Sequence, residues 1–204
     1  MPRPSNTEIR RREIVRALLR LMGSRGYAGA SVQSIAREAG LTPGLVHYHF
    51  AGKQEILLEL ARNLADRVRA RFEARCGPTD TAWNRLDAFI DAHLETGEDA
   101  DPEAVRCWVA VGAEALRRPE LREIYGRTVR EETEVLRGLV RAVFDEERRP
   151  QTGTESVAAG LLAAIYGCFQ LSALGSAIPK NSAAATVRAM ARGLLRSPSH
   201  GEQG

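Results

Sequence analysis

The side chains that could do chemistry gather in two stretches of the chain. Between residues 31 and 53, hydroxyl, imidazole and amino groups stand close together around a glycine. Beyond residue 80, aromatic and polar residues are interspersed with apolar ones, a mixture that lines small-molecule pockets. The sequence contains no GxSxG, no HExxH, no P-loop and no Rossmann glycine run after a strand. We therefore expect a binding protein and not an enzyme.

Cysteine and histidine spacing argues against metal and disulfide chemistry. Cys76, Cys107 and Cys168 are widely spaced and form neither a CxxC pair nor an even-numbered framework, which favours a reducing cytoplasm. His47 and His49 lie two residues apart, on different sides of a helix, so we predict no metal site and no cofactor. A redox-responsive regulator built on Cys107 or Cys168 is an alternative, although burial in helices would disfavour a reactive thiolate.

Charge is unevenly distributed along an otherwise ordinary globular composition, with 44% hydrophobic and 27% charged residues. The net charge is +3, but residues 1–75 carry 14 Lys or Arg against 7 Asp or Glu, a balance of +7. The remainder is slightly acidic. A basic N-terminal part predicts contact with a polyanion, and nucleic acid and anionic membrane are both open on this observation alone.

An uncharged run of 24 residues, 156–179, is long enough to span a bilayer by length alone. It is rich in Ala, Gly and Ser, contains Gln170, and has no cluster of Lys or Arg at either end. We therefore expect a core helix that is buried on nearly all sides, and no membrane span.

Hydrophobic periodicity predicts an all-α fold of about nine helices and no strand. Ser5 and Glu8 have the spacing of a capping box at the start of the first helix, and Gly23 and Gly26 are expected to end it. Thr154 is predicted to cap the uncharged helix. The other predicted helices span 31–40, 43–50, 53–75, 82–94, 102–116, 119 to just before 150, and 181–196, followed by a disordered tail, 197–204.

Two of these short helices are separated by a tight glycine turn. Ala36 lets the helices approach, Gly40 can adopt the positive φ of a sharp turn, and Val46 anchors the second helix on the first. Thr42 caps the second helix, and Pro43 occupies its first position. The spacing is typical of a helix-turn-helix. An unrelated αα-hairpin is the alternative, which the basic flanking sequence disfavours.

Residues 30–57, ASVQSIAREAGLTPGLVHYHFAGKQEIL, resemble the DNA-binding domain of the tetracycline-repressor (TetR) family of bacterial regulators, and the match extends from Arg10 to about Leu60. More weakly, residues 108–125 and the helix around 164–179 resemble the C-terminal domain of the choline-responsive BetI-type branch. The resemblance implies a DNA-binding domain at residues 1–52. It also implies a ligand-binding and dimerisation domain at 53–196, whose first helix, 53–75, connects the two.

The resemblance also implies roles for residues on the predicted helix 43–50. Thr42 and Tyr48 offer hydroxyl groups for phosphate. Gly44 and Leu45 sit where backbone or an apolar contact could meet a base edge in the major groove. The family often has Tyr where this chain has His47, so Tyr48 can take over a phosphate contact there.

Basic residues on either side of this helix complete the expected interface. Lys53 matches the family's lysine at the start of the fourth helix, where its ammonium would lie beside a phosphate. Arg10, Arg11 and Arg12 are either solvated charge or phosphate contacts, and His49 is either packed beside the next residue or in contact with DNA. The predicted DNA-binding residues are Ser31, Thr42, Pro43, Gly44, Leu45, His47, Tyr48, His49 and Lys53.

Operator specificity predicts a homodimer, because helix-turn-helix proteins bind two half-sites roughly 34 to 36 Å apart. Small residues of the uncharged helix permit close helix approach, and with the last helix they could form a four-helix interface between subunits. An ordinary intrachain core helix is the alternative. The predicted interface residues are Gly160, Ala163, Ala164, Gly167, Leu194 and Leu195.

A small-molecule site is expected among the aromatic residues of the larger part, although each of them has a core role as its alternative. The predicted ligand-binding residues are Phe89, His93, Trp108, Tyr125, Tyr166, Phe169 and Gln170. Choline and a flat apolar compound are both candidate effectors. The predicted function is a repressor that binds an inverted-repeat operator double-stranded DNA and is released by an inducer. A helical interaction module that binds no DNA is a further alternative.

Overall fold

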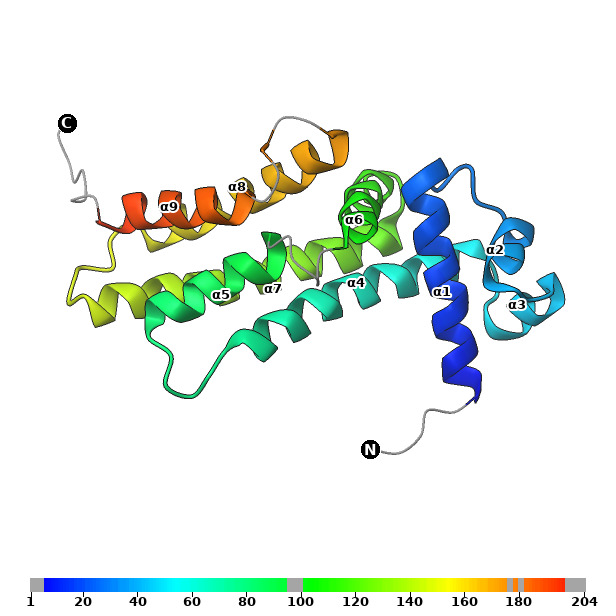
Figure 1. Cartoon of the computed structure of the whole chain (residues 1–204), viewed down its shortest axis with the longest axis horizontal. Helices are drawn as coiled ribbons and strands as arrows, with labels where there is room; N and C mark the ends of the chain where they lie inside the picture. The colour runs from blue at the N-terminus through cyan, green and yellow to red at the C-terminus, as the bar shows by residue number, and fades with distance from the viewer. Residues whose placement is uncertain (1–5, 95–100, 176–177, 180–181, 197–204) are drawn as a thin grey trace. The chain divides into compact units, whose positions relative to one another are not determined.

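The computed structural model describes residues 6–94, 101–175, 178–179 and 182–196. These residues form nine α-helices and no strand, which confirms the predicted all-α fold (Figure 1). The fourth and fifth helices have the predicted boundaries. The helices are α1 (Asn6–Arg25), α2 (Val32–Ala39), α3 (Pro43–His49), α4 (Lys53–Arg75), α5 (Ala82–Leu94), α6 (Pro102–Ala115), α7 (Pro119–Glu146), α8 (Thr154–Leu174) and α9 (Ala183–Arg196).

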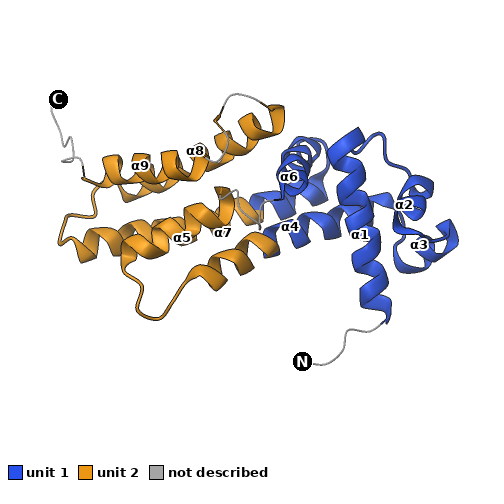
Figure 2. Cartoon of the chain, viewed as in Figure 1, with its two compact units in different colours: residues 1–66, 101–126 blue, residues 67–100, 127–204 orange. Residues whose placement is uncertain are grey.

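The chain divides into two compact units (Figure 2). Unit 1 comprises residues 1–66 and 101–126, and unit 2 comprises residues 67–100 and 127–204. Helices α4 and α7 each belong to unit 1 in their first part and to unit 2 in their second. The units do not follow the predicted boundary after residue 52, because α6 packs on α1 and groups with the helix-turn-helix. The functional division at residues 1–52 and 53–196 remains a prediction.

In unit 1, α1 packs against α2, α3 and α6. Its apolar stripe is the buried face, with Ile14 and Leu18 fully inaccessible. Of the two glycines predicted to end this helix, Gly26 does so and Gly23 does not. Gly23 lies within α1, and Gly26 follows its last residue with φ at +68°, a left-handed conformation that a glycine adopts without strain.

In unit 2, α5, α8 and α9 pack against one another. Two ion pairs join α9 to α5 one turn apart: Arg192 contacts Asp87 at 2.5 Å, and Arg188 contacts Asp91. These pairs fix the face that α9 turns toward α5. The core of this group includes Leu86, Ile90, Leu161, Ile165, Val187 and Leu195.

Helix α8 is buried on one face within the chain, and the prediction that it is buried on nearly all sides is wrong. Ala158, Leu161 and Ile165 are inaccessible, whereas Leu174 is 74% exposed. By length and composition α8 could also cross a membrane. An 18-residue segment of it has a mean hydropathy of 1.8, and 33% of that segment is buried. A core helix of a soluble protein has the same properties, so length and composition alone decide nothing here.

The start of α8 also differs from the prediction. Gly153 is the N-cap residue with φ at +81°, and Thr154 is the first helical residue. The Thr154 hydroxyl donates to the Gln151 carbonyl at 2.7 Å and does not cap the helix. The expected capping residue Ser5, the start of the last helix at residue 181, and the tail 197–204 lie outside the described residues.

Candidate functional site

The turn between α2 and α3 has the predicted geometry. Gly40 has φ at +68°, and the Leu41 N–H donates to the Ala36 carbonyl at 2.9 Å, which closes the end of α2. The Thr42 side chain accepts from the Leu45 N–H at 3.3 Å and caps α3. These contacts span only a few residues, so the sequence between 36 and 45 determines them.

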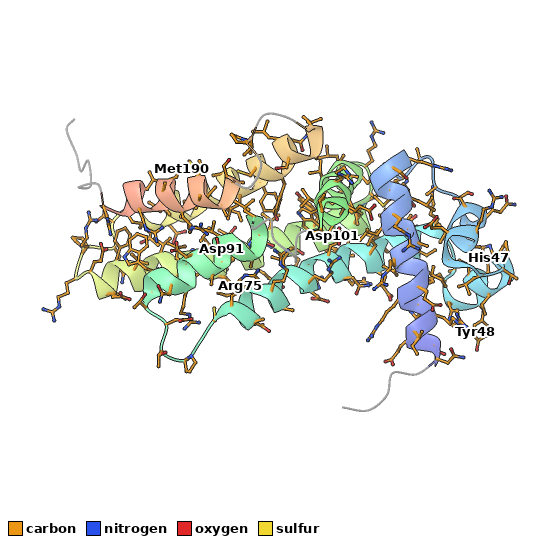
Figure 3. All side chains as sticks on the ribbon, viewed as in Figure 1. His47, Tyr48, Arg75, Asp91, Asp101 and Met190 are labelled. Atoms are coloured by element: carbon orange, nitrogen blue, oxygen red, sulfur yellow. The ribbon has the colours of Figure 1, made fainter. Side chains whose placement is uncertain are left out.

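The surface of α3 divides into a buried anchor and an exposed face. Val46 is fully buried, as expected for the residue that holds α3 on α2. Leu45 and His49 are half-buried. Tyr48 is 79% exposed, and Figure 3 labels it and His47 on the outer side of α3. The exposed residues of the predicted interface in this region are Thr42, Pro43, Gly44, His47 and Tyr48.

Ser31 is exposed, but its hydroxyl is engaged in the cap of α2. It accepts from the Ser34 N–H at 3.1 Å, while the Ser34 hydroxyl accepts from the Ser31 N–H at 2.8 Å. This reciprocal capping box was not part of the prediction, because Ser replaces the usual Glu or Gln three residues on. Gln33 and Arg37 are exposed one turn apart on α2 and were missed by the sequence reasoning.

Lys53 is half-buried and bonded to the protein. Its ammonium donates to the Tyr27 carbonyl at 3.0 Å and to the Ala30 carbonyl at 2.6 Å. It also lies 4.1 Å from the centre of the Tyr27 ring, whose other cationic neighbour is the Arg118 guanidinium at 4.7 Å. Burial lowers the pKa of Lys53, and the positive charge of Arg118 lowers it further. The ammonium therefore ties the start of α4 to the loop between α1 and α2.

The three arginines at the start of α1 have three different environments. Arg10 pairs with Glu13 at 2.8 Å, and Arg12 is exposed. Arg11 is half-buried and donates to the His49 carbonyl and to Glu59. Solvated charge and phosphate contact are the two roles predicted for these residues. Neither role includes the internal contacts that Arg11 makes.

Four of the predicted ligand-binding residues meet in unit 2, and we call them the aromatic cluster: Phe89, His93, Tyr166 and Phe169. The His93 ring lies 4.4 Å from that of Phe89 and 6.3 Å from that of Phe169, between centroids. Glu132 of α7, which the sequence reasoning missed, accepts a hydrogen bond from the Tyr166 hydroxyl at 2.8 Å. A carboxylate therefore borders the aromatic cluster.

The His93 ring is oriented by the backbone. Nδ1 lies 2.8 Å from the Phe89 carbonyl, and since a carbonyl only accepts, Nδ1 carries the proton in that bond. Nε2 lies 3.4 Å from Glu132 Oε1, and the side chain of His93 is 2% exposed. Nε2 makes no hydrogen bond within the described residues. Nε2 of His93 is therefore a buried polar atom beside the Glu132 carboxylate.

The remaining predicted ligand-binding residues lie elsewhere. Trp108 and Tyr125 belong to unit 1, where their rings stack with centroids 4.8 Å apart. Gly112 leaves room for this stack, because a Cβ there would lie 3.1 Å from the Tyr125 hydroxyl. Gln170 is exposed on α8 and does not join the aromatic cluster.

Two family models match the chain along most of its length. The model of bacterial regulatory proteins of the tetR family matches residues 14–60, which include the whole helix-turn-helix. The model of the C-terminal part of BetI-type transcriptional repressors matches residues 82–196, more than half of the chain. The chain belongs to the TetR family. The N-terminal resemblance and the weaker C-terminal one are both confirmed.

Relatives of this TetR-family protein are transcriptional regulators. The HTH-type transcriptional regulator BetI of Rhizobium meliloti (strain 1021) is 33% identical over 180 residues, 87% of this chain and 84% of the relative. BetI of Brucella anthropi is 30% identical over 90% of this chain and 92% of the relative. The chain is therefore a DNA-binding transcriptional regulator and not an enzyme.

Solved structures share the fold. A transcriptional regulator from Rhodococcus sp. Rha1 has a TM-score of 0.78 and 23% identity, covering 94% of this chain and 96% of its own. A regulator from Saccharomonospora viridis in complex with choline has a TM-score of 0.77 and 22% identity, covering 96% of this chain and 100% of its own. At these identities the comparison establishes the architecture of the TetR-family chain, and its ligand remains a separate question.

The predicted dimer-interface residues of the TetR-family chain are only partly on its surface. Gly160, Ala163 and Gly167 are exposed along α8, and Leu194 of α9 is 48% exposed. Ala164 is half-buried. Leu195 is fully buried within the chain, because it points into the core of unit 2. Leu171, Leu174 and Met190 are exposed apolar residues on the same two helices that the prediction did not include.

Cys107 and Cys168 do not have the environment of a reactive thiolate. Burial raises the pKa of the Cys107 thiol to about 12, and burial also raises the pKa of Cys168. A raised pKa lowers the fraction of thiolate, which is the reactive form. Cys107 contacts Met22 between sulfur atoms 3.9 Å apart, so it packs as an apolar core residue.

Proposed function

We propose that this chain is a cytoplasmic repressor that binds an inverted-repeat DNA operator as a homodimer and is released by a small-molecule effector. The observation that carries the proposal is the capped, seven-residue α3, which offers Thr42, Gly44, His47 and Tyr48 to solvent while Val46 anchors it. An exposed helix of this kind fits the major groove. Footprinting on DNA flanking its own gene tests the proposal, and protection of no specific site would contradict it.

Within this interface, hydroxyl groups position the protein and other groups read bases. Thr42 and Tyr48 contact phosphates, whereas Gly44, Leu45 and His47 face base edges. The Thr42 side chain accepts one hydrogen bond as a helix cap, so its own hydroxyl proton is available to a phosphate oxygen. Pro43 holds the start of the helix, and Ser31, Gln33 and Arg37 present the exposed side of α2 to the same backbone.

Lys53 contributes a phosphate contact with its remaining donor. An ammonium group has three N–H donors, and the carbonyls of Tyr27 and Ala30 use two of them. Lys53→Ala should therefore weaken binding to all DNA sequences alike and reduce the slope of log affinity against log salt by about one unit. Titration of a specific and an unrelated duplex at several salt concentrations measures this. A change in sequence preference instead would assign Lys53 to base reading.

Dimerisation is supported by an uncharged, exposed stripe on α8. Gly160, Ala163 and Gly167 lie on it at helical spacing, and Leu194 adds an exposed apolar group from α9. Small residues allow the backbones of two helices to approach closely. Sedimentation of Ala163→Arg should give a monomer with reduced operator affinity. A variant that stays dimeric would place the interface elsewhere.

An organic cation is the effector class that the aromatic cluster supports. Phe89, Tyr166 and Phe169 supply π faces, and Glu132 supplies a negative charge beside them. The choline-bound regulator from Saccharomonospora viridis has the same fold, which makes choline the first compound to test. A thermal-shift screen with choline, betaine aldehyde, polyamines and aromatic acids separates cations from flat apolar compounds. An effector must also lower operator affinity, because only differential binding shifts the equilibrium.

A further inference from the structure

We infer that Arg11 is a positioning residue that holds the C-terminal end of the recognition helix α3 on α4, and that it is not a phosphate ligand. The inference rests on the proposed site-specific binding by α3. Arg11 lies on α1, 38 residues before the carbonyl that it contacts, so no local motif indicates this role.

The guanidinium of Arg11 contacts α3, α4 and the residue directly after α3 at once. Nη1 donates to the His49 carbonyl at 2.5 Å, in the last turn of α3. Nη2 donates to Glu59 and lies 3.6 Å from Glu55, both on α4. The guanidinium carbon is 4.0 Å from the centre of the buried Phe50 ring, directly after α3. The hydrogen bond with Glu59 raises the pKa of Arg11, so the group stays charged.

Contacts at the C-terminal end of α3 matter because this helix is too short to be stable alone. Helices shorter than about 12 residues need tertiary contacts, and α3 has 7. Its start is fixed locally by the Thr42 cap and the Gly40 turn. Its end has carbonyl groups without a partner inside the helix, and Arg11 satisfies the one on His49. Arg11 therefore sets where the exposed face that includes His47 and Tyr48 points.

The geometry requires a guanidinium. One planar group donates from two nitrogens in different directions and stacks its face on Phe50, which an ammonium cannot do. The Arg11 side chain is 27% exposed, with its two terminal nitrogens facing protein acceptors. Arg12, the next residue, is exposed and provides a matched control at the same end of α1.

The test compares Arg11→Gln, Arg11→Lys and Arg12→Gln in the full-length protein. The probes are a duplex that the wild-type protein selects from a random library and an unrelated duplex of equal length. For both Arg11 variants we expect specific affinity to fall about tenfold or more, in line with the strength of charged hydrogen bonds. Non-specific affinity and the salt slope should stay near the wild-type values, and Arg12→Gln should preserve the ratio of specific to non-specific affinity.

Two results would overturn the inference. A salt slope reduced by about one unit, an equal loss on both duplexes and rescue by Arg11→Lys would make Arg11 a phosphate ligand. Unchanged operator affinity together with a lower melting temperature would make it a purely structural residue.

Amide hydrogen exchange keeps the test independent of the operator. In Arg11→Gln the amides of residues 43–50 should exchange faster, whereas those of α2 should be unchanged in rate. If the wild-type protein selects no sequence, the proposed function fails while this measurement still decides the role of Arg11. Unchanged exchange in residues 43–50 would contradict the inference that Arg11 holds the end of α3.

Discussion

The helix-turn-helix of unit 1 and the aromatic cluster of unit 2 are built in opposite ways. In the first, Ser31 bonds Ser34 and Thr42 bonds Leu45, each three residues away. In the second, Tyr166 bonds a carboxylate 34 residues away, and the rings come from α5 and α8. The first site also presents exposed groups, whereas Phe89, His93 and Phe169 of the second are buried. A motif held by contacts between neighbouring residues can be recognised in the sequence. A site built by contacts between residues far apart in the sequence cannot.

The two sites also handle polar groups differently. Thr42, His47 and Tyr48 are exposed and can exchange water for phosphate or base contacts at low cost. The His93 side chain is 2% exposed, and Nε2 makes no hydrogen bond within the described residues. The exposed site would therefore suit a large charged partner, and the proposed buried site a small one.

The largest loss of stability without a loss of DNA binding is expected for a substitution at Phe89. Its side chain is 3% exposed and packs against the rings of Phe72 and His93. Phe89→Ala should lower the free energy of unfolding by about 3 to 5 kcal/mol. Urea denaturation measures the loss. Operator affinity measured well below the melting temperature should stay within about twofold, because Phe89 belongs to unit 2 and the predicted DNA-binding residues belong to unit 1.

The matched control for this change is Tyr166→Phe. It keeps the ring and removes the hydroxyl that donates to Glu132, so we expect a loss of about 1 to 3 kcal/mol. A large loss of operator affinity in fully folded Phe89→Ala would show that the two sites are not separable.

The same substitution, glycine to alanine, is expected to change the free energy of unfolding in opposite directions at two positions of unit 1. Gly40→Ala places a side chain at φ +68° and should lower the free energy of unfolding by about 1 to 2 kcal/mol. Gly23→Ala lies inside α1, where a Cβ meets Glu103 at an ordinary 3.8 Å, and should raise it by up to about 1 kcal/mol. Denaturation of both variants gives the two values. The same sign for both would contradict the assigned turn geometry.

The smallest effect at neutral pH is expected from thiol chemistry. The raised pKa of Cys107, about 12, keeps the thiol protonated at pH 8 in the folded protein, so alkylation should proceed only as fast as unfolding. Above about pH 9 the unfolded thiol ionises first, and stability should fall as the pH rises toward 12. Mass spectrometry after alkylation, with a denatured control, measures this. Rapid labelling of native Cys107 would favour a redox-responsive regulator.

Sequence alone predicted the fold class and the helix-turn-helix, because caps and turns depend on neighbouring residues. Gly40, Thr42 and Pro43 have the conformations that their types favour. Gly26 ends α1 as predicted, whereas Gly23, which was also predicted to end it, lies inside the helix, and backbone φ distinguishes the two glycines. The predicted cap of α8 is wrong because glycine can cap a helix without a side chain.

Contacts between distant residues could not be predicted. The partners of Arg11 and Lys53 are set by how α1, α3 and α4 pack, and spacing carries no signal for them. Glu132 stands among several acidic residues of α7, and nothing in the sequence distinguishes the one beside Tyr166. The uncharged composition of α8 predicts burial on all sides, but composition does not distinguish a helix buried on every side from one that leaves an uncharged face exposed.

Selection from a random duplex library with the wild-type protein and with Leu45→Ala and His47→Ala tests most directly whether α3 reads operator sequence. The wild-type protein should select an inverted repeat. Each variant should lose or change its preference at symmetry-related positions in both half-sites, with about 1 to 3 kcal/mol of discrimination lost for each base contact. A consensus that both variants leave unchanged, or a wild-type protein that selects no sequence at all, would contradict recognition by α3.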